Sequence, residues 1–341
     1  MKTLLLRLNR HLSALSYVVT VILPVTIRSR KRPIIFSRWG GIGDILCTLP
    51  TVSELIKRHP DCVYIYNCAP EARCLPRLAG LPVQVTTMPD IGLVHFWYGR
   101  FFGRFYEFKY SEEAVNVISH EILHREFARL HGVMVGDQHP KLMNDPAAEL
   151  GVKALLENHG FSQGKPHQPV IVIHPGPTWA VKEWPATAWA ALVEKLGQNR
   201  YGKIFQLGTK NHANLQNAIA PEIPGVISLV DKLSLEETIA LISMADLFIG
   251  IDSGLLHIAA SVQTPTVGLW GPTAPRLLFS GKSSRFFLVS NVECVACHYR
   301  RPRLHWVSGC PYDIKCMKAI PVEDVLANCL NCLSSLKDGR Y

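Results

Sequence analysis

Short apolar runs alternate with helical patterns along most of this chain, and no other feature limits the fold as strongly. Strands that alternate with helices form parallel sheets with helices on both faces. In the first half of the chain, the expected strands are residues 33–37, 63–66 and 93–97. In the second half, they are residues 170–174, 203–207, 247–251 and 266–270. The sequence therefore predicts an α/β protein with parallel sheets.

Helical periodicity fills the intervals between these strands. The expected helices are residues 44–55, 100–135, 144–156, 185–196, 234–244 and 254–262. Ser234 and Glu237 have the spacing of a capping box at the start of one of them. Residues 164–169 have the composition of a linker. We expect two Rossmann-like domains, 33–164 and 165–341, whose sheets face each other across a cleft with ligands at the carboxyl ends of the strands.

Residues 1–32 precede the first expected strand and differ in composition from the rest. Their apolar stretch from Leu12 to Ile27 is shorter than the roughly 20 residues that span a membrane, and Pro24 interrupts it. No small-residue cleavage site of a signal peptide follows. We expect either an interfacial anchor on anionic lipid or an extra helix packed on the protein. Basic residues flank the stretch: Arg7, Arg10 and His11 before it, and Arg28, Arg30, Lys31 and Arg32 after it.

Composition and charge exclude some classes of protein. Hydrophobic residues make up 48% of the 341 positions and charged residues 18%, which excludes a disordered chain. Lys and Arg number 36 against 27 Asp and Glu, and the net charge of +9 suits anionic partners. The basic residues are dispersed, and no nucleic-acid-binding motif occurs. We therefore expect phosphate-bearing ligands or an anionic membrane, and no nucleic acid.

The first candidate site is the segment 37–44, Ser-Arg-Trp-Gly-Gly-Ile-Gly-Asp, where a strand passes into a helix. Its glycines let the backbone approach a ligand, and the N-terminus of the following helix favours negative charge. The segment is not a dinucleotide fingerprint, because position 46 is Leu rather than Gly. Asp44 is either a carboxylate at the mouth of the cleft or an N-terminal capping residue of the helix.

The second candidate site is the segment 174–185, His-Pro-Gly-Pro-Thr-Trp-Ala-Val-Lys-Glu-Trp-Pro. A strand ends here in a Gly/Pro turn that presents a hydroxyl and an ammonium group before the next helix. Thr178 and Lys182 are suited to hold a diphosphate, the first as a hydrogen-bond donor and the second as a point charge. An ordinary surface loop with a solvated lysine has the same local pattern.

The third candidate site is the segment 250–257, Gly-Ile-Asp-Ser-Gly-Leu-Leu-His, which again joins a strand to a helix. The backbone amides of Ser253 and Gly254 lie at the helix N-terminus, and with the helix dipole they make an anion site. His257 is either a ligand-binding residue or a satisfied core histidine. The Gly-Pro-Thr turn at 271–273 is expected to close the same pocket.

The order of these three segments resembles glycosyltransferase family 9, the lipopolysaccharide heptosyltransferases, whose members have the GT-B fold. The resemblance covers residues 33–317 and rests on Arg38 with Gly43-Asp44, on His-Pro-Gly…Lys-x-Trp-Pro, and on Asp-Ser-Gly-x-x-His with Gly-Pro-Thr after it. It implies inverting transfer of a sugar from a nucleotide diphosphate, usually ADP-heptose, to a hydroxyl of a lipopolysaccharide core or another cell-surface glycan. It also implies that the first domain binds acceptor and the second binds the nucleotide sugar.

The resemblance also implies roles for individual residues. Asp44 is the general base that takes the proton of the acceptor hydroxyl. Arg38 and Gly43 are expected to contact the acceptor or a phosphate. No Asp-x-Asp sequence occurs, so a metal-chelated diphosphate has no candidate, and we expect no cofactor for catalysis. Six residues are expected to contact the donor: Thr178, Lys182, Asp252, Ser253, Gly254 and His257.

Six of the ten cysteines lie near the end of the chain. Four of them have the spacing of a structural zinc or iron site: Cys294, Cys297, Cys310 and Cys316. Free or redox-active thiols and disulfides are the alternatives, and a cytoplasmic sugar-nucleotide enzyme argues against disulfides. Cys329 and Cys332 are spaced for one face of a helix, and they are either core thiols or alternative metal ligands.

Two other functions fit the same architecture. A nucleotide-sugar 2-epimerase would need acid and base groups around the sugar but no acceptor. A non-catalytic protein would bind the nucleotide sugar without transferring it. For the transferase we expect a cytoplasmic location, peripheral on the inner face of the cytoplasmic membrane, because the basic and apolar N-terminal segment favours an acceptor held there.

Overall fold

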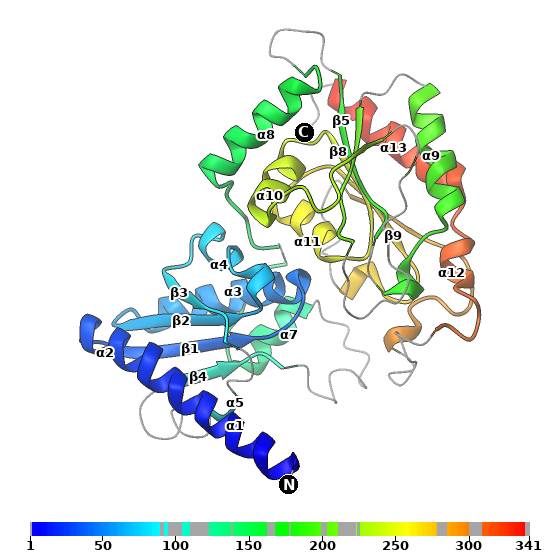
Figure 1. Ribbon diagram of the computed structural model, residues 1–341. Coiled ribbons are helices and arrows are strands. Elements are labelled where there is room, and N and C mark those ends of the chain that lie inside the picture. Colours follow the sequence, from blue (N-terminus) through cyan, green and yellow to red (C-terminus); the bar gives the residue numbers. More distant parts are fainter. Residues whose placement is uncertain are drawn as a thin grey trace. The chain divides into compact units, whose positions relative to one another are not determined.

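The protein contains two compact units, each built around its own parallel sheet, in the computed structural model (Figure 1). The first unit includes the described residues up to 140, and the second includes those from 141 onward. The structure describes residues 2–88, 92–94, 104–109, 123–137, 139–161, 168–176, 179–198, 203–210, 223, 226–277, 285–299 and 309–337.

The sheet of the first unit has the strand order β3-β2-β1-β4, and every neighbouring pair is parallel. Helix α3 (Ile42–Arg58) connects the two central strands and buries the apolar side of an amphipathic sequence, including Leu46 and Val52, against them. Because β1 has neighbours on both sides that come later in the chain, the topological switch point lies between β1 and β4. The strands are β1 (Arg32–Arg38), β2 (Cys62–Cys68), β3 (Val83–Thr86) and β4 (Arg104–Glu107).

A continuous run of helix precedes the first strand. It comprises α1 (Lys2–Tyr17), one π-helical turn at Val18–Ile22, and α2 (Leu23–Ser29). Pro24 does not end the helix, because it lies in the first turn of α2. The wider π turn before it accommodates the hydrogen bond that the proline cannot donate. This run packs on the first unit and is the helix drawn in dark blue in Figure 1.

Short elements complete the first unit. The strand predicted at residues 93–97 is not present at the positions that the structure describes: Gly92–Val94 is a single helical turn, and residues 95–97 lie outside the described part. Val94 is fully buried in the cluster that contains the N-terminal helix. It therefore packs against a segment far away in the sequence and does not belong to a sheet. The remaining elements are a 3₁₀ turn at Pro70–Ala72, α4 (Leu75–Leu78) and α7 (Leu123–Leu130).

The predicted helix over residues 100–135 is also wrong in part. Residues 104–107, Arg-Phe-Tyr-Glu, form the edge strand β4, in which Phe105 faces the core. Only Leu123–Leu130 is helical among the described residues of that range. Four residues are too few to show the alternation of a strand within a mixture of aromatic and charged side chains.

The sheet of the second unit has the strand order β10-β9-β8-β5-β6-β7 and is parallel throughout. Renumbered within the unit, this is the 6-5-4-1-2-3 order of a doubly wound nucleotide-binding fold, with the switch point between β5 and β8. The predicted α/β fold with two parallel sheets is therefore confirmed. The strands are β5 (Val170–His174), β6 (Lys203–Gln206), β7 (Ile227–Ser228), β8 (Leu247–Ile251), β9 (Thr266–Trp270) and β10 (Arg285–Val289).

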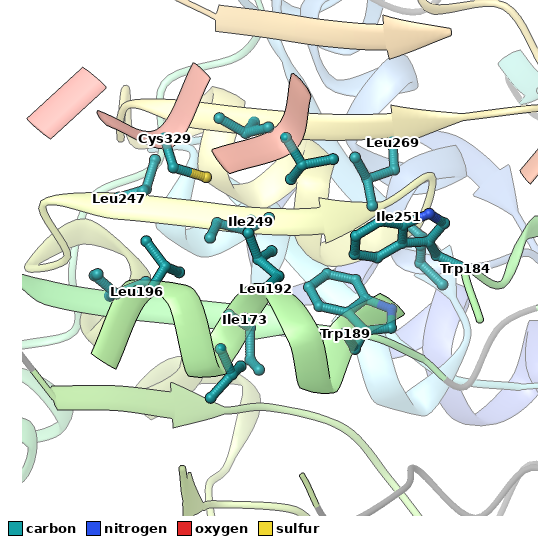
Figure 2. Packing of buried hydrophobic residues seen from close by; sticks show 14 of the residues in the cluster. Ile173, Trp184, Trp189, Leu192, Leu196, Leu247, Ile249, Ile251, Leu269 and Cys329 are labelled. Carbon is teal, nitrogen blue, oxygen red and sulfur yellow. The ribbon is translucent and has the colours of Figure 1, made fainter. Parts of the chain in front are cut away.

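One large apolar core lies on a face of this sheet, between the strands and two helices (Figure 2). Helix α9 (Ala186–Gln198) contributes Trp189 and Leu192, and helix α13 (Val322–Lys337) contributes Cys329. Cys332 is buried in the same core, so the two cysteines share one helix face, as their spacing predicted, and of the two alternatives they are core thiols. Burying a tryptophan and several aliphatic side chains contributes roughly 1.5–3 kcal/mol each.

The boundary between the two units lies before helix α8. Helix α8 (Pro146–Asn158) packs on α10 (Leu235–Ser243), so it belongs to the second unit, whereas the sequence placed residues up to 164 in the first domain. Ser234 and Glu237 form the capping box expected at the start of α10: Glu237 N–H donates to Ser234 Oγ, and Ser234 N–H donates to the Glu237 carboxylate. The other described helices of this unit are α11 (Gly254–Ser261), α12 (Lys315–Lys318) and 3₁₀ turns at Ala180–Lys182, Pro275–Leu277 and Cys297–Tyr299.

Candidate functional site

The switch point of the second sheet determines where its candidate site lies. β5 and β8 are neighbours with His174 paired to Gly250, and the chain leaves the two strands in opposite directions. Such a divergence leaves a crevice at the carboxyl ends of the strands. The turn after β5 requires a glycine at Gly176, whose φ of 143° is disfavoured for other residues and whose missing Cβ would lie 3.2 Å from the Glu183 carboxylate.

A buried ion pair forms at these strand ends. Lys182 Nζ lies 2.6 Å from Asp252 Oδ2, and the two side chains are only 12% and 5% exposed. Thr273 Oγ1, from the turn after β9, donates to the same carboxylate oxygen at 2.5 Å. The three residues come from the loops after three different strands, so the fold, and not local sequence, brings them together.

The environment of Asp252 keeps its carboxylate ionised. Burial alone would raise its pKa, but the charge of Lys182 and the hydrogen bonds from Lys182 and Thr273 outweigh burial and hold the pKa below its usual value. A lysine that neutralises a buried carboxylate carries little net positive charge to a ligand. The pair is therefore suited to positioning the ammonium group, which has three donor hydrogens and can share them between Asp252 and an anion.

Ser253 and Gly254 lie where the sequence predicted, at the start of α11. Ser253 is the N-cap in an extended conformation, and its hydroxyl lies 3.1 Å from His174 Nδ1 instead of capping the helix. The first N–H groups of a helix have no partner within the helix, so this end offers donors to an anion. His257 is buried in the next turn and lies close enough to Asp252 to favour its charged form.

Two aromatic side chains that the sequence analysis did not select adjoin the ion pair. Lys182 Nζ lies 4.2 Å from the centroid of the Trp179 ring, and the rings of Trp179 and His298 are 5.8 Å apart. Burial, with a contribution from the charge of Lys182, lowers the pKa of His298 to about 4, so the ring is neutral at pH 7. The position of Trp179 inside the 174–185 motif was the available signal; nothing local pointed to His298.

Thr178 lies outside the described residues, so its predicted contact with the diphosphate stays a prediction.

A further carboxylate, that of Asp231, lies near the carboxyl ends of β6 and β7. Its Oδ2 accepts a hydrogen bond from the Lys210 backbone at 2.9 Å. Asp231 was not predicted as a site residue from the sequence, because the strand before it, β7, has only two residues.

The candidate site of the first unit lies at the switch point of its own sheet. Arg38 ends β1, and its guanidinium donates to Asp44 Oδ1 and to the backbone oxygen of Phe108, each at 2.8 Å. Phe108 directly follows β4, so Arg38 joins the ends of the two strands between which the switch point lies. The guanidinium also lies 5.7 Å from the centroid of the Phe127 ring.

Asp44 occupies the first turn of α3. Its second oxygen accepts the Gly41 N–H at 3.1 Å, so Asp44 caps the start of α3 from within its first turn; Gly41, the N-cap, has no side chain that could complete a capping box. The side chain of Arg38 is 9% exposed and that of Asp44 is 30% exposed, so the carboxylate is held from behind and open on one side. Gly40 is required here because a Cβ would lie 2.8 Å from the Asp44 carboxylate. Gly43 lies in the same helical turn.

The four predicted cysteine ligands lie near each other in the second unit. The thiol pKa of Cys316 is raised to about 12 by burial and by the other three cysteines, which are close enough to act on it: Cys294, Cys297 and Cys310. None of the ten cysteines forms a disulfide bond. Among the residues that the structure describes, no three His, Cys, Asp or Glu side chains converge closely enough to share a metal ion.

Backbone hydrogen bonds connect this cysteine segment to the turn that holds Asp252. Ala296 N–H donates to the Gly271 oxygen at 2.8 Å, and His298 N–H donates to the Pro272 oxygen at 2.9 Å. These two acceptors directly precede Thr273, which holds Asp252. The segment is therefore part of the wall of the candidate donor site.

Comparison with known proteins identifies relatives of the chain. A family model described as "Glycosyltransferase family 9 (heptosyltransferase)" matches residues 88–305, more than half of the chain. The chain is 26% identical to lipopolysaccharide heptosyltransferase 1 of Pseudomonas aeruginosa over 142 residues, 42% of this chain and 40% of the relative. It is 33% identical to lipopolysaccharide heptosyltransferase 3 of Escherichia coli over 131 residues, 38% of this chain and 37% of the relative. The matches thus span about two fifths of these relatives.

A solved structure extends the likeness over most of the chain. It is the crystal structure of the dodecameric iron-containing heptosyltransferase TibC of enterotoxigenic E. coli in complex with ADP-D-beta-D-heptose. The likeness covers 90% of this chain and 77% of the other, with a TM-score of 0.67 and 18% sequence identity. At this identity it concerns the fold alone.

Proposed function

This chain belongs to glycosyltransferase family 9, and we propose that it transfers a sugar from a nucleotide diphosphate to a hydroxyl group, with inversion at the anomeric carbon. Heptose from ADP-heptose is the proposed donor, since the named relatives are heptosyltransferases and the TibC structure contains ADP-D-beta-D-heptose. The proposed acceptor is a lipopolysaccharide core or a similar cell-surface glycan. The single observation that carries this proposal is the buried Lys182–Asp252 pair at the switch point of the second sheet.

The second unit is the proposed donor site. The start of α11 at Ser253 and Gly254 and the ammonium group of Lys182 lie at the carboxyl ends of adjacent strands, where a diphosphate accepts hydrogen bonds. The helix N-terminus supplies positive potential and Lys182 supplies positioned hydrogen-bond donors, and both stabilise the departing diphosphate more strongly as negative charge develops on it. Asp252 and Thr273 hold Lys182 in place before the donor arrives, which limits the reorganisation needed during reaction.

The first unit supplies the proposed base. The acceptor hydroxyl would give its proton to the Asp44 carboxylate while its oxygen forms a bond to the anomeric carbon. The bond from that carbon to the diphosphate oxygen breaks, and the electron pair leaves with the nucleoside diphosphate. Because the attack comes from the face opposite the leaving group, the configuration inverts. Arg38 orients the carboxylate and leaves its exposed side to the acceptor.

A thermal-shift comparison of nucleotides tests the donor class. A ligand that binds only the folded protein, present at about 100 times its dissociation constant, stabilises it by roughly 2.7 kcal/mol. We expect ADP to raise the unfolding temperature and UDP, GDP and CMP at the same concentration to leave it unchanged. A shift with UDP or GDP alone would overturn the ADP-heptose assignment and leave the transferase. Absence of a shift with all four would contradict the proposed donor site.

We further propose that the four cysteines hold a structural zinc or iron ion. Four thiolates are the donor set that these metals favour, none of the four cysteines is in a disulfide, and the other three are close enough to Cys316 to raise its pKa. A metal there would stabilise the segment that contacts the turn before Thr273. TibC, a structural neighbour, is described as iron-containing.

Metal content is the direct measurement of this site. Protein purified without chelator is expected to contain about one zinc or iron per chain by elemental analysis, as four thiolates form one tetrahedral site. Cys294→Ser is expected to lower this content at least tenfold, whereas Cys62→Ser, another half-buried thiol in the other unit, leaves it unchanged. Equal metal content in the two variants, or none in the wild type, would exclude the site.

We propose the inner face of the cytoplasmic membrane as the place of this reaction. The N-terminal segment combines basic residues with an apolar helix of suitable composition, and this favours an acceptor held at that membrane. Within the described residues, one helix, Asn9–Ser29, is long and apolar enough to cross a membrane, with a mean hydropathy of 1.5.

A further inference from the structure

The N-terminal helix has two apolar faces, and only one of them is used within the protein. Ala14, Tyr17 and Ile22 are buried to 1%, 0% and 2% exposure in one cluster with the sheet residues Ile35 and Ile65. The hydroxyl of Tyr17 also hydrogen-bonds to the Thr86 hydroxyl of β3 at 2.6 Å. This face fixes the helix on the first unit.

The opposite face is apolar as well, and it is exposed. Successive members are three or four positions apart, so they form one stripe along the helix from its middle to its end. The side chains of this stripe are Leu12 (56% exposed), Leu15 (60%), Val19 (52%), Leu23 (46%) and Ile27 (72%). They make up five of the thirteen large hydrophobic residues that are exposed in the described part of the chain. Single exposed apolar side chains are ordinary, but a continuous stripe marks an interaction surface.

The charge of the same segment is of one sign. The first acidic residue of the chain is Asp44, whereas seven basic residues precede position 33. They are Lys2, Arg7, Arg10, Arg28, Arg30, Lys31 and Arg32. Those after α2, at residues 30–32, are exposed and follow directly on the end of the stripe. Such a surface attracts an anionic partner and repels a second copy of itself.

We propose that this stripe inserts into the headgroup region of an anionic lipid bilayer, with the helix in the plane of the membrane and the first unit fixed to its other face. An apolar face bordered by Lys and Arg is the composition of interfacial helices. The length and hydropathy of Asn9–Ser29 would also permit a spanning helix. Spanning, however, would remove Tyr17 and Ile22 from the core and break the Tyr17–Thr86 hydrogen bond. The geometry thus favours a helix that lies on the membrane.

Vesicle cosedimentation of the full chain tests this proposal, and it does not depend on any sugar transfer. Vesicles of phosphatidylcholine with 30% phosphatidylglycerol, about a physiological share of anionic lipid, are compared with pure phosphatidylcholine. We expect at least tenfold tighter binding to the anionic vesicles, and release at high salt or in alkaline carbonate. Retention in alkaline carbonate would show a spanning helix and overturn the proposal.

Matched triple variants identify the surface. Leu15→Ser, Val19→Ser and Ile27→Ser together are expected to weaken binding to anionic vesicles at least tenfold. The control combines Met134→Ser, Met143→Ser and Leu150→Ser, which are exposed to 89%, 58% and 68% elsewhere, and should bind like the wild type. An unchanged unfolding temperature in both variants shows that the fold is retained. Equal binding of the two variants to anionic vesicles contradicts the proposal. It is also contradicted if the wild type is a dimer in solution and only the stripe variant is a monomer.

Discussion

Asp44→Asn is expected to lower the rate of sugar transfer by about 10²–10⁴-fold while the affinity for the nucleotide donor stays the same. The substitution keeps the size of the side chain and one oxygen that can accept the Gly41 N–H. It removes the one feature that the proposed reaction needs from this residue, which is a carboxylate that can take the proton of the acceptor hydroxyl. The rate is measured as sugar transferred per enzyme at saturating donor, and the affinity by calorimetry.

Stability provides the first control for this variant. The Arg38–Asp44 ion pair is partly exposed on the Asp44 side, so its loss should cost no more than about 1 kcal/mol. The matched variant Asp61→Asn removes an exposed carboxylate of the same unit and should transfer sugar at the wild-type rate. If Asp44→Asn retains transfer within a factor of three of the wild type, the role of Asp44 is limited to capping the N-terminus of α3.

The two units show what local sequence can and cannot predict. The β1–α3 and β8–α11 junctions were predicted from sequence because an apolar run, glycines and a helical period lie next to each other there. The run at 93–97 had the same apolar character, but the N-terminal helix covers Val94, and that contact is not visible locally. Strand β10 was missed entirely, and its pairing with β9 is a property of the whole sheet.

The same difference applies to the candidate sites. Lys182 and Asp252 were both selected from their motifs, but their pairing could not be predicted, because it depends on β5 and β8 being neighbours. Likewise Arg38 and Asp44 were chosen as separate functional residues, and the structure joins them through one guanidinium. His298 was missed because the backbone bond to Pro272, not a sequence pattern, brings it to Trp179.

Lys182→Met is expected to destabilise the second unit by roughly 3–5 kcal/mol at pH 7 and to abolish measurable ADP binding. Methionine replaces the aliphatic part of lysine but removes the positive charge, so the Asp252 carboxylate stays buried with the Thr273 hydroxyl still donating to it. An unpaired buried charge is what makes breaking such a pair costly. Urea unfolding at pH 7, with the midpoint and slope both measured, gives the free energy of unfolding.

The double variant Lys182→Met with Asp252→Asn separates stability from ligand binding. Asparagine is neutral and can still accept the Thr273 hydroxyl, so the double variant should recover most of the lost free energy of unfolding. It should not recover ADP binding, because the ammonium group proposed to hold the diphosphate is still absent. Recovery of both would mean that Lys182 supports the fold and does not bind the donor.

The dependence on pH follows from the sign of the Asp252 shift. In the wild type the pKa is lowered, so its ion pair contributes stability at pH values above the unfolded pKa of about 3.9, and this contribution disappears as the pH falls through the folded pKa. In Lys182→Met the lowering partner is gone and burial dominates, so the pKa rises and protonation relieves the cost as the pH falls. The difference in unfolding free energy between wild type and variant should therefore be largest near pH 7 and shrink towards pH 5. A difference that stays constant over this range would show that lost packing of the lysine stem, and not the buried charge, causes the destabilisation.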